Sequence, residues 1–326
     1  MSTFTLERYT PGAKAEWNAA VGAARNGTFL FRREYMDYHA NRFEDRSLLV
    51  RDHRGRLAAL FAAATSRGEE TDVITAHPGL TYGGLILPME TRGADVLTIL
   101  TDIVAHYAAE GFRTLVCRPV PHIYHRFPCE EDIYALWRLG ATMDCCQLSA
   151  TIENPDGAPS RSQNTNRLIA KGIKAGVQVV ESQDYAAFHR MLVETLAERH
   201  NAAPVHSLAE IELLASRFPD NIRLWMAVNP DGVPMAAVMM FLTDTCAHTQ
   251  YICSTSRGRE CGALPVLLSR LAELYSDRRY FDFGTSNEDH GRFLNEGLLR
   301  QKNGFGARGT VYPSYRLEIK TASEAL

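Results

Sequence analysis

Hydrophobic and polar positions follow the same order in the two halves of the chain. Residues 47–65 (SLLVRDHRGRLAALFAAAT) and 221–241 (NIRLWMAVNPDGVPMAAVMMF) each predict two apolar strands around a charged turn, the pattern of a β-hairpin. Each hairpin precedes another predicted strand and a loop of small residues, at residues 77–87 and 246–256. The sequence therefore predicts a structural unit that occurs twice.

A helix and a short strand complete each predicted unit. Apolar residues spaced by three and four fall on one helical face. They are Leu97, Leu100, Val104 and Tyr107 in the first half and Leu264, Leu267, Leu268, Leu271 and Tyr275 in the second. Short strands follow at residues 113–120 and 279–286. Tandem copies of hairpin, strand, loop, helix and strand predict an α/β (α+β) fold with a cleft between the halves.

A connector separates the predicted units. Residues 153–166 (ENPDGAPSRSQNTN) are rich in Pro, Gly, Ser and Asn, which is typical of an exposed linker. We therefore expect an N-terminal domain at residues 1–152 and a C-terminal domain at residues 167–326.

Composition and charge limit the class of protein. The chain has 326 residues, 45% of them hydrophobic and 22% charged, as expected for two soluble globular domains. Its net charge of -3 gives no global attraction to nucleic acid or to an anionic membrane. No apolar run approaches the roughly 20 residues that cross a bilayer, and the N-terminus lacks a secretory pattern. We expect a cytoplasmic protein without membrane insertion.

The cysteines indicate buried, reduced thiols. The seven cysteines lie in or near predicted strands and form no CxxC pair. The sequence HIYH at residues 122–125, with Cys129 nearby, lacks a clear fourth ligand for zinc. We therefore expect no metal.

The loop after the predicted strand of the second half carries the strongest chemical signal. Residues 254–263 (STSRGRECGA) contain glycine and run into a helix with Pro265 in its first turn. Such a loop presents backbone N–H groups and the positive end of the helix dipole to a phosphate group, although glycine turns also arise for purely geometric reasons. The expected phosphate contacts are Ser254, Arg257, Gly258, Arg259, Gly262 and Ala263.

This loop resembles the pyrophosphate site of the GNAT acyltransferases. Arg259 and Gly262 match the first two positions of the family's pattern (Gln or Arg, two residues, Gly, one residue, Gly or Ala), whereas Leu264 departs from the third. The first half has no equivalent loop. The resemblance implies two tandem GNAT-like domains, each a mixed and mostly antiparallel sheet flanked by helices, with acyl-CoA bound by the second domain alone.

The resemblance covers nearly the whole chain. The tandem order, the basic segment 166–176 and the ending FDFGTSN are similar to the FemABX-like double-GNAT proteins. Within that group, five segments resemble acyltransferases of surface-polysaccharide pathways that acylate the amine of a nucleotide-linked amino sugar. These segments are NGTFLFRREYMDYHANRFEDRSLLV, HPGLTYGGL, PVHSLAEI, HTQYI and LNEGLLRQKNGFGA.

The resemblance implies acyl-CoA and a nucleotide-linked amino sugar as small-molecule partners. The alternatives are a transferase that takes an aminoacyl group from tRNA and a non-catalytic module that binds a glycan or a nucleotide. The acidic net charge disfavours tRNA, because a large polyanion is bound best by a basic surface. A homodimer is left open.

Acyl transfer to an amine requires a group that accepts the amine proton. The predicted strand at residues 246–252 alternates between two faces: His248, Gln250 and Ile252 on one, Thr249 and Tyr251 on the other. His248 and Glu288 are the candidate bases, with a structural histidine and a helix-capping carboxylate as alternatives. We favour His248 because an unperturbed imidazole exists in its neutral form near physiological pH.

Several other side chains are candidates for contact with the acceptor between the halves. Tyr82 precedes two glycines and could lie against a sugar or base. His206 precedes a predicted capping box, Ser207-x-x-Glu210. The remaining candidates are Arg167 and Lys171 (with Lys174 on one face of a predicted helix), Gln250, Asn287, Asn295 and Lys302. A local structural role or a solvated surface is the alternative for each.

Overall fold

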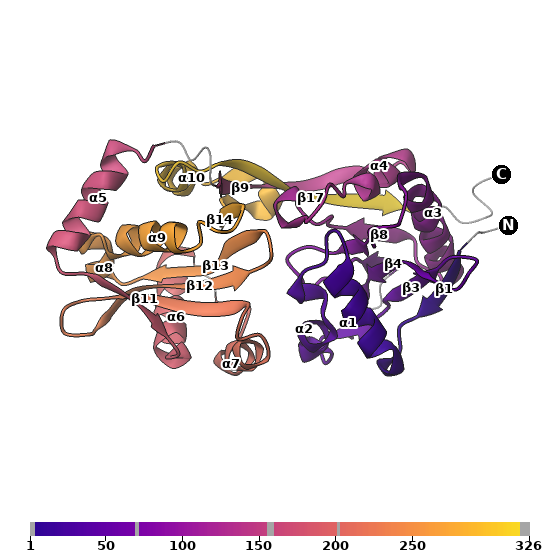
Figure 1. The fold of residues 1–326 in the computed structure, drawn as a ribbon, viewed down its shortest axis with the longest axis horizontal. Coiled ribbons are helices and arrows are strands. Elements are labelled where there is room, and N and C mark those ends of the chain that lie inside the picture. Colours follow the sequence, from indigo (N-terminus) through magenta and orange to yellow (C-terminus); the bar gives the residue numbers. More distant parts are fainter. Residues whose placement is uncertain (1–3, 69–71, 155–159, 201–202, 320–326) are drawn as a thin grey trace. The chain divides into compact units, whose positions relative to one another are not determined.

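The computed structural model describes residues 4–68, 72–154, 160–200 and 203–319. The described chain divides into two compact units, and it passes between them in β9 (Thr142–Glu153), on either side of His290–Arg292 and in β17 (Arg308–Glu318) (Figure 1). Unit 1 contains the described residues up to Gln147, His290–Arg292 and residues 311–319. Unit 2 contains Leu148–Asp289 and Phe293–Thr310, apart from the undescribed residues.

The C-terminal strand corrects the predicted domain boundary. Tyr315 of β17 pairs with Cys117 of β8 (Thr114–Cys117) in antiparallel register, so the end of the chain completes the sheet of unit 1. The predicted linker is also too long, because α5 (Gln163–Lys174) begins within it and Ser162 caps that helix. Residues 155–159 of the predicted linker lie outside the described residues.

Unit 1 combines two sheets with helices. Its first sheet has the strand order β1-β3-β4-β7, and strands β17, β8, β6, β5 and β2 are neighbours in that order in the second. The predicted hairpin at residues 47–65 is confirmed by the antiparallel pairing of β3 with β4. The repeat is not exact, because β5 and β6 lie between this hairpin and β7, and β6 runs parallel to β8.

The elements of unit 1 are as follows. The strands are β1 (Thr5–Arg8), β2 (Phe43–Asp45), β3 (Leu48–Arg51), β4 (Leu57–Ala62), β5 (Ala64–Ser66), β6 (Val73–Thr75), β7 (Gly84–Ile86) and β8. The α-helices are α1 (Lys14–Ala23), α2 (Arg33–Met36), α3 (Gly93–Ala109) and α4 (Glu131–Arg138). Short 3-10 helices occur at Pro11–Ala13, Phe29–Phe31, Asp37–His39 and His122–Tyr124, and that at Asp289–Gly291 lies where the chain passes from unit 2 to unit 1.

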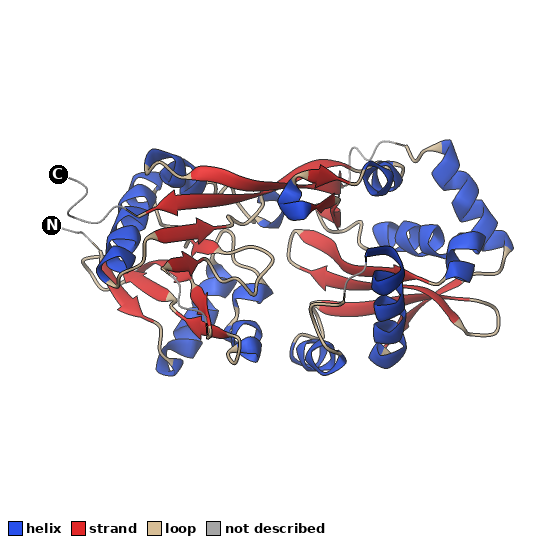
Figure 2. Ribbon diagram, turned by 180° about the vertical axis from the view of Figure 1, so that it is seen from behind, coloured by secondary structure: helices blue, strands red, loops and turns tan. Residues whose placement is uncertain are grey.

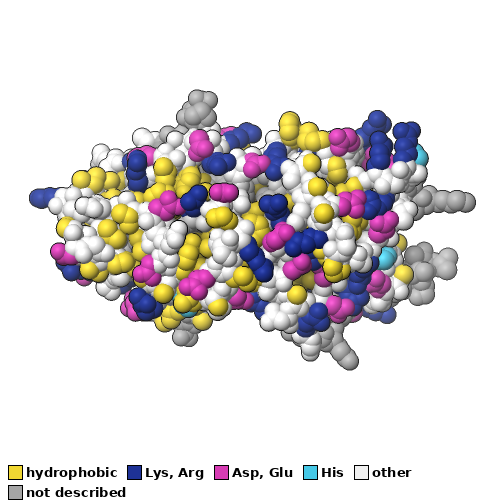
Figure 3. Space-filling model, turned by 60° about the horizontal axis from the view of Figure 1, so that its bottom comes forward, with side chains coloured by type: hydrophobic (Ala, Val, Ile, Leu, Met, Phe, Trp, Pro, Cys, Tyr) yellow, Lys and Arg dark blue, Asp and Glu magenta, His cyan; other side chains and the backbone are white. Residues whose placement is uncertain are grey.

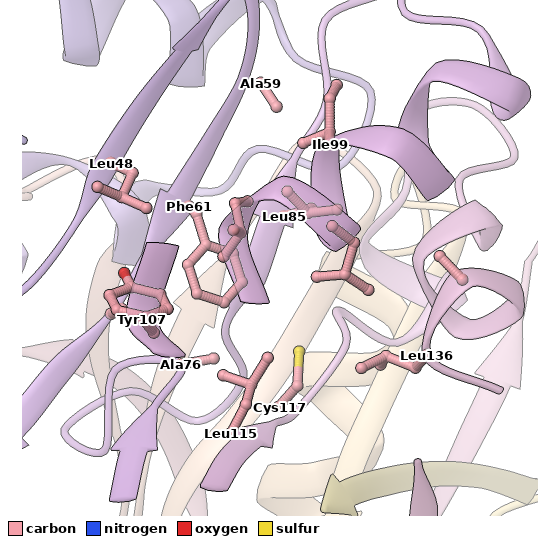
Figure 4. Close-up of a cluster of buried hydrophobic side chains, with 14 of the residues drawn as sticks. Leu48, Ala59, Phe61, Ala76, Leu85, Ile99, Tyr107, Leu115, Cys117 and Leu136 are labelled. Atoms are coloured by element: carbon pink, nitrogen blue, oxygen red, sulfur yellow. The ribbon is translucent and has the colours of Figure 1, made fainter. Parts of the chain in front are cut away.

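Helix α3 closes the hydrophobic core of unit 1. Phe61 of β4, Ile99 and Tyr107 of α3 and Leu115 of β8 point into one cluster (Figure 4). Each of these side chains is buried, and burial of such a side chain contributes about 1.5–3 kcal/mol. The predicted helical face is confirmed at Tyr107, whereas the predicted Leu97 is only partly buried at the margin of the cluster.

Unit 2 contains a single larger sheet with helices on both faces. Strands β10, β11, β12, β13, β14 and β9 are neighbours in that order, and only the β13–β14 pairing among them is parallel. The predicted hairpin at residues 221–241 is confirmed, with Gly232 at a φ of 79° in its turn. Helix α9 packs on one face of the sheet and α6 on the other (Figures 1 and 2).

The elements of unit 2 are as follows. The strands are β10 (Gln178–Ser182), β11 (Ile222–Val228), β12 (Pro234–Leu242), β13 (Cys246–Ser254), β14 (Tyr280–Thr285), β15 (Asn287–Glu288) and β16 (Phe293–Leu294). The helices are α5, α6 (Tyr185–His200), α7 (Leu208–Arg217), α8 (Ser256–Cys261), α9 (Ala263–Leu274) and α10 (Glu296–Asn303). Across the described ranges of both units, no helix combines the length and apolar character needed to cross a membrane.

Helix α5 packs against the start of α9 through two glycines. A Cβ atom on Gly172 of α5 would lie 2.5 Å from Cγ2 of Val266 and 2.7 Å from the carbonyl oxygen of Gly262. These distances are too short for any side chain, so the close contact of the helices depends on glycine at position 172.

Gly172→Ala is expected to destabilise unit 2. The added methyl group overpacks the α5–α9 contact, which costs about 1–3 kcal/mol of unfolding free energy. Gly22→Ala is the matched control, because a Cβ at that position in α1 has no atom within 4 Å and should stabilise the helix by about 0.5–1 kcal/mol. Urea unfolding of both variants checks the difference, and equal stability of the two would refute the packing argument.

Candidate functional site

Strands β13 and β14 separate in the middle of the sheet of unit 2. Their parallel pairing covers Cys246–His248 and ends with His248 opposite Asp282, although β13 continues to Ser254. Strand β14 keeps β9 as its neighbour on its other side from Tyr280 to Thr285, with a register shift between Asp282 and Thr285. His248 and Asp282 therefore mark the point at which the two strands part.

A β-bulge in β13 lies next to this point and corrects the predicted alternation. Met240 of β12 pairs with Thr249 and Met239 pairs with Tyr251, so Gln250 is the extra residue. Directly paired residues share a face of a sheet. His248 and Tyr251 thus lie on the face opposite α9, whereas Thr249 and Ile252 lie on the α9 face. The predicted grouping of His248, Gln250 and Ile252 on one face is wrong because the bulge shifts the alternation.

His248 and Asp282 form a buried pair. Nδ1 of His248 lies 2.7 Å from Oδ2 of Asp282, and Oδ1 of Asp282 accepts hydrogen bonds from the hydroxyl groups of Ser149 and Thr151 in β9. Burial acts to raise the pKa of Asp282, but the hydrogen bond and charge of His248 and the two hydroxyl donors outweigh it and hold that pKa below its ordinary value. An ionised Asp282 favours a proton on Nδ1 of His248, which leaves the lone pair on Nε2.

Lys302 of α10 places an amine at the end of β14. Its side chain is buried, and Nζ donates hydrogen bonds to the carbonyl oxygens of Gly284 at 2.8 Å and Thr285 at 2.7 Å. Burial lowers the pKa of Lys302 to about 8, while the charge of Asp282 acts to raise it. Lys302 is therefore not a solvated lysine, and its third N–H bond has no acceptor among the residues that the structure describes.

His206 lies on the same face of the sheet as His248. Its Nδ1 is 2.6 Å from the hydroxyl oxygen of Tyr251, whose ring contacts Phe188 of α6. The predicted capping box is confirmed, because Ser207 and Glu210 exchange hydrogen bonds at the start of α7. His206 is buried by this arrangement, and its contact with a ligand stays a prediction.

The segment predicted as an open phosphate loop is helical instead. Helix α8 occupies Ser256–Cys261, and Gly262, with a φ of 84°, joins it to α9. A Cβ on Gly258 would lie 2.1 Å from the carbonyl oxygen of Met235, and one on Gly262 would lie 2.4 Å from that of Leu168 in α5. Packing within the protein therefore requires both glycines, and α5 covers the start of α9.

The side chains of this segment mostly bind the protein itself. Arg259 donates to the carbonyl oxygen of Ser254 at 2.6 Å and to the hydroxyl group of Ser256 at 2.7 Å. The Ser254 hydroxyl donates to Met235, and Ala263 is fully buried. The expected open cradle of backbone N–H groups does not fit this described segment, in which Arg257 is an exposed cation.

The residues that follow β14 stabilise local structure. Oδ1 of Asn287 accepts a hydrogen bond from the backbone N–H of Leu148 at 2.6 Å. Asn295 is the N-cap of α10, and its amide donates to the exposed carboxylate of Glu288 at 3.1 Å. Glu288 thus binds the side chain of a helix-capping residue, and both its role as a base and its capping role stay predictions.

The other expected acceptor contacts lie in different elements. Tyr82 belongs to unit 1, where it is buried and its hydroxyl donates to Thr28 at 3.1 Å. Arg167 and Lys171 are exposed on α5, which confirms the predicted helix, and Arg167 donates to Asn164 at 3.0 Å. Their contacts with an acceptor stay predictions.

The cysteines and histidines of the described ranges form no metal cluster of three or more ligands. His125 of the HIYH sequence is buried, with Nε2 2.7 Å from the carbonyl oxygen of Val120. Four cysteines are buried free thiols as expected, whereas Cys146 is exposed because it lies on an exposed stretch of β9.

Comparison with known proteins bears on the fold and the reaction class. Residues 159–292, most of unit 2, match the model of the acetyltransferase (GNAT) domain family. Comparison with curated protein sequences gives no match. Among solved structures, FemX has a TM-score of 0.69 at 11% identity, covering 96% of this chain and 97% of that one. A tandem GNAT protein from the clavulanic acid biosynthesis pathway has a TM-score of 0.55 at 12% identity, with 98% and 99% covered.

The fold is a tandem GNAT fold. L-PGS from Bacillus licheniformis has a similar fold, with a TM-score of 0.63 at 8% identity over 97% of this chain and 95% of that one. Identities this low show the shared fold alone, which confirms the predicted fold class. The shared fold leaves the substrates of this protein to be argued from its own residues.

Sequence reasoning identified His248 but not the network that holds it. Asp282 stands between two phenylalanines in the strand YFDFGT, and a charged residue inside an apolar strand needs buried partners. That pattern could have signalled the pair. Ser149 and Thr151 could not be assigned in this way, because β9 reaches β14 only through the tertiary fold.

Thr151→Val tests the hydrogen-bond network. With one hydroxyl donor removed, the pKa of Asp282 in the folded state should rise. An Asp whose pKa is lower in the folded protein than in the unfolded chain stabilises the fold at any pH above its unfolded-state pKa. This stabilisation is lost as the pH falls through its pKa in the folded protein. The variant should therefore lose about 1 kcal/mol at neutral pH and unfold at a higher pH in an acid titration followed by circular dichroism. Thr142→Val, at an exposed position of β9, is the control, and identical acid midpoints would contradict the network.

Proposed function

We propose that this protein transfers an acyl group to an amine, with the chemistry centred on His248 and Asp282. The observation that carries the proposal is the buried pair at the point where β13 and β14 part, with Nδ1 of His248 held 2.7 Å from the carboxylate. This arrangement leaves Nε2 as a proton acceptor. The match of unit 2 to the acetyltransferase (GNAT) domain family supports the class of reaction.

The proposed reaction uses the residues of unit 2 in distinct roles. The amine nitrogen attacks the carbonyl carbon of an acyl thioester, a C–N bond forms and the C–S bond breaks. The surplus proton moves from nitrogen to Nε2 of His248 and then to the leaving thiolate, while Asp282 stabilises the charged imidazole. Lys302 has a pKa of about 8 and an N–H bond without an acceptor in the described part of the chain, so at neutral pH it offers a positive donor to the developing oxyanion.

We propose acyl-CoA as the donor. It would lie along the edge of β13 beyond His248, where β13 no longer pairs with β14. An unpaired strand edge can hydrogen-bond with the amide groups of an extended ligand, and the pantetheine arm of CoA contains such groups. Because the glycine-containing segment at residues 254–263 is not an open loop, other groups must bind the diphosphate of CoA. The exposed Arg257 is the proposed contact of this segment for the phosphate groups.

For the acceptor we propose the amine of a nucleotide-linked amino sugar, in the synthesis of a surface polysaccharide. The support is the sequence resemblance of residues 248–252 (HTQYI) and 294–307 (LNEGLLRQKNGFGA) to acyltransferases of that kind. These two segments contain His248 and Lys302, the residues to which the proposal assigns the proton transfer and the oxyanion.

A transferase that uses the aminoacyl ester of tRNA is the second candidate. It is favoured by α5, whose Leu168 carbonyl lies against Gly262 where the diphosphate of CoA was expected. A large polyanion, however, is bound best by a continuous basic surface. On the face drawn in Figure 3, Lys and Arg side chains are interspersed with Asp and Glu, which favours the smaller donor.

His248→Asn and Glu288→Gln test the assignment of the base. Removal of a positioned general base should lower kcat by about 100-fold to 10,000-fold with little change in either KM. We expect this loss for His248→Asn and near-normal turnover for Glu288→Gln, measured as acylated product per time with acetyl-CoA and a nucleotide-linked amino sugar. Near-normal turnover in both variants would remove His248 from the mechanism, and a large loss in Glu288→Gln alone would reassign the base.

Thermal unfolding with CoA or with unacylated tRNA distinguishes the two donors. A ligand that binds only the folded protein raises the melting temperature according to its concentration relative to its Kd. We expect a shift with CoA that is reduced in Arg257→Gln and retained in Arg270→Gln, whose arginine is exposed on α9. A shift with tRNA and none with CoA would favour the aminoacyl donor.

A further inference from the structure

Unit 1 contains a cavity of about 320 Å³ that is lined entirely by its own residues. A volume of this size falls in the range of pockets that bind small molecules. The lining combines a cation, an acid, aromatic rings and a thiol: Arg118, Asp144, Tyr82, Tyr312 and Cys145. The reaction proposed for unit 2 uses none of the charged groups of this cavity.

Arg118 is the most informative residue of the cavity. It follows β8 and is partly buried, yet its guanidinium group makes no hydrogen bond or ion pair with the described residues. By contrast, the buried Arg25 and Arg33 of the same unit each bind a carboxylate. A partly desolvated cation that bonds directly to no carboxylate is costly, and the planar fork of arginine matches a carboxylate or a phosphate group. Arg118 is thus suited to an anionic group on a ligand.

Tyr82 and Tyr312 supply aromatic surface to the same cavity, and both are fixed. The hydroxyl of Tyr82 donates to Thr28, and the hydroxyl groups of Tyr312 and Tyr124 lie 2.7 Å apart. The rings of Tyr82 and Tyr124 pack with their centroids 4.7 Å apart. Both residues are almost fully buried, so the small part of each that reaches the cavity forms a fixed wall that loses little freedom on binding.

The backbone at one side of the cavity is strained. Asp289 and the lining residue His290 have φ angles of 48° and 50°, a region that residues other than glycine rarely occupy. The carbonyl group of His290 accepts a hydrogen bond from the Cys145 thiol at 3.0 Å, which ties the strained turn to the cavity. Strain of this kind costs roughly 1–3 kcal/mol per residue and tends to be kept where a ligand binds.

We propose that this cavity binds a sugar-sized ligand that carries one anionic group. Arg118 binds the carboxylate or phosphate, the tyrosines form a fixed wall beside the sugar, and the exposed carboxylate of Asp144 accepts hydrogen bonds from sugar hydroxyl groups. This binding is a property of unit 1 by itself. Its test is therefore a binding measurement, which does not depend on whether the protein transfers acyl groups.

Calorimetric titration of the full chain with three probes tests the proposal. Glucuronate carries a carboxylate, glucose 1-phosphate carries a phosphate, and glucose carries neither. We expect at least one acidic sugar to bind, and glucose to bind at least roughly 10-fold more weakly, because a hydrogen bond to a charged group is lost. The stronger of the two acidic sugars identifies the anionic group. Binding of neither, or equal binding of glucose, would overturn the proposal.

Variants of Arg118 connect any binding to the cavity. Arg118→Gln should lower the affinity for the acidic sugar by roughly 10-fold to 100-fold. Arg118→Lys keeps the charge and should lower this affinity less. Arg138→Gln, at an exposed position of α4, is the matched control and should bind normally. Unchanged affinity in Arg118→Gln would contradict the assignment.

Alkylation of Cys145 gives a second measurement that needs no variant. The acidic sugar should slow the modification of this thiol, measured by mass spectrometry, and should leave Cys261 of unit 2 unaffected. Equal rates at Cys145 with and without a bound acidic sugar would place the ligand outside the cavity and overturn the proposal.

Discussion

A carboxylate buried inside an apolar strand must be compensated, and the centre of unit 2 depends on how this is done for Asp282. Its neighbours Phe281 and Phe283 pack into the core on the α9 face, so the alternation of the strand directs Asp282 to the opposite face. There β13 supplies His248 and β9 supplies two hydroxyl groups. Strands β13 and β9 must therefore both keep their register against β14 for the Asp282 carboxylate to have all its hydrogen bonds. The requirement that stabilises the sheet thus also fixes the tautomer of the proposed base.

The same centre is where the regular sheet ends. A bulge at Gln250 alters β13, and the register of β14 against β9 shifts between Asp282 and Thr285. Gly284, with a φ of 74°, provides the conformation that this shift needs. Both irregularities adjoin the last paired residues of β13 and β14, and bulges commonly redirect side chains next to functional sites. The opening between the strands and the placement of Lys302 at the end of β14 both follow from this irregular backbone.

Local patterns predicted the elements well, because hairpins and helical faces depend on nearby residues. The hairpins at residues 47–65 and 221–241 and the capping box at Ser207 are examples. Features set by distant segments were missed. The glycine at position 262 matched a phosphate-loop pattern, but its close neighbour is Leu168 of α5. The return of β17 to unit 1 likewise depends on pairing with β8, which periodicity within one strand does not encode.

The protonation state of the two ring nitrogens of His248 tests the central claim most directly. Long-range proton–nitrogen NMR of the ¹⁵N-labelled protein can distinguish the nitrogen that carries the proton in the neutral ring. The account predicts a proton on Nδ1 and a lone pair on Nε2 in the wild type, and loss of this preference in Asp282→Asn. A neutral ring protonated on Nε2 in the wild type would contradict it, because that nitrogen could then not accept the proton of the attacking amine.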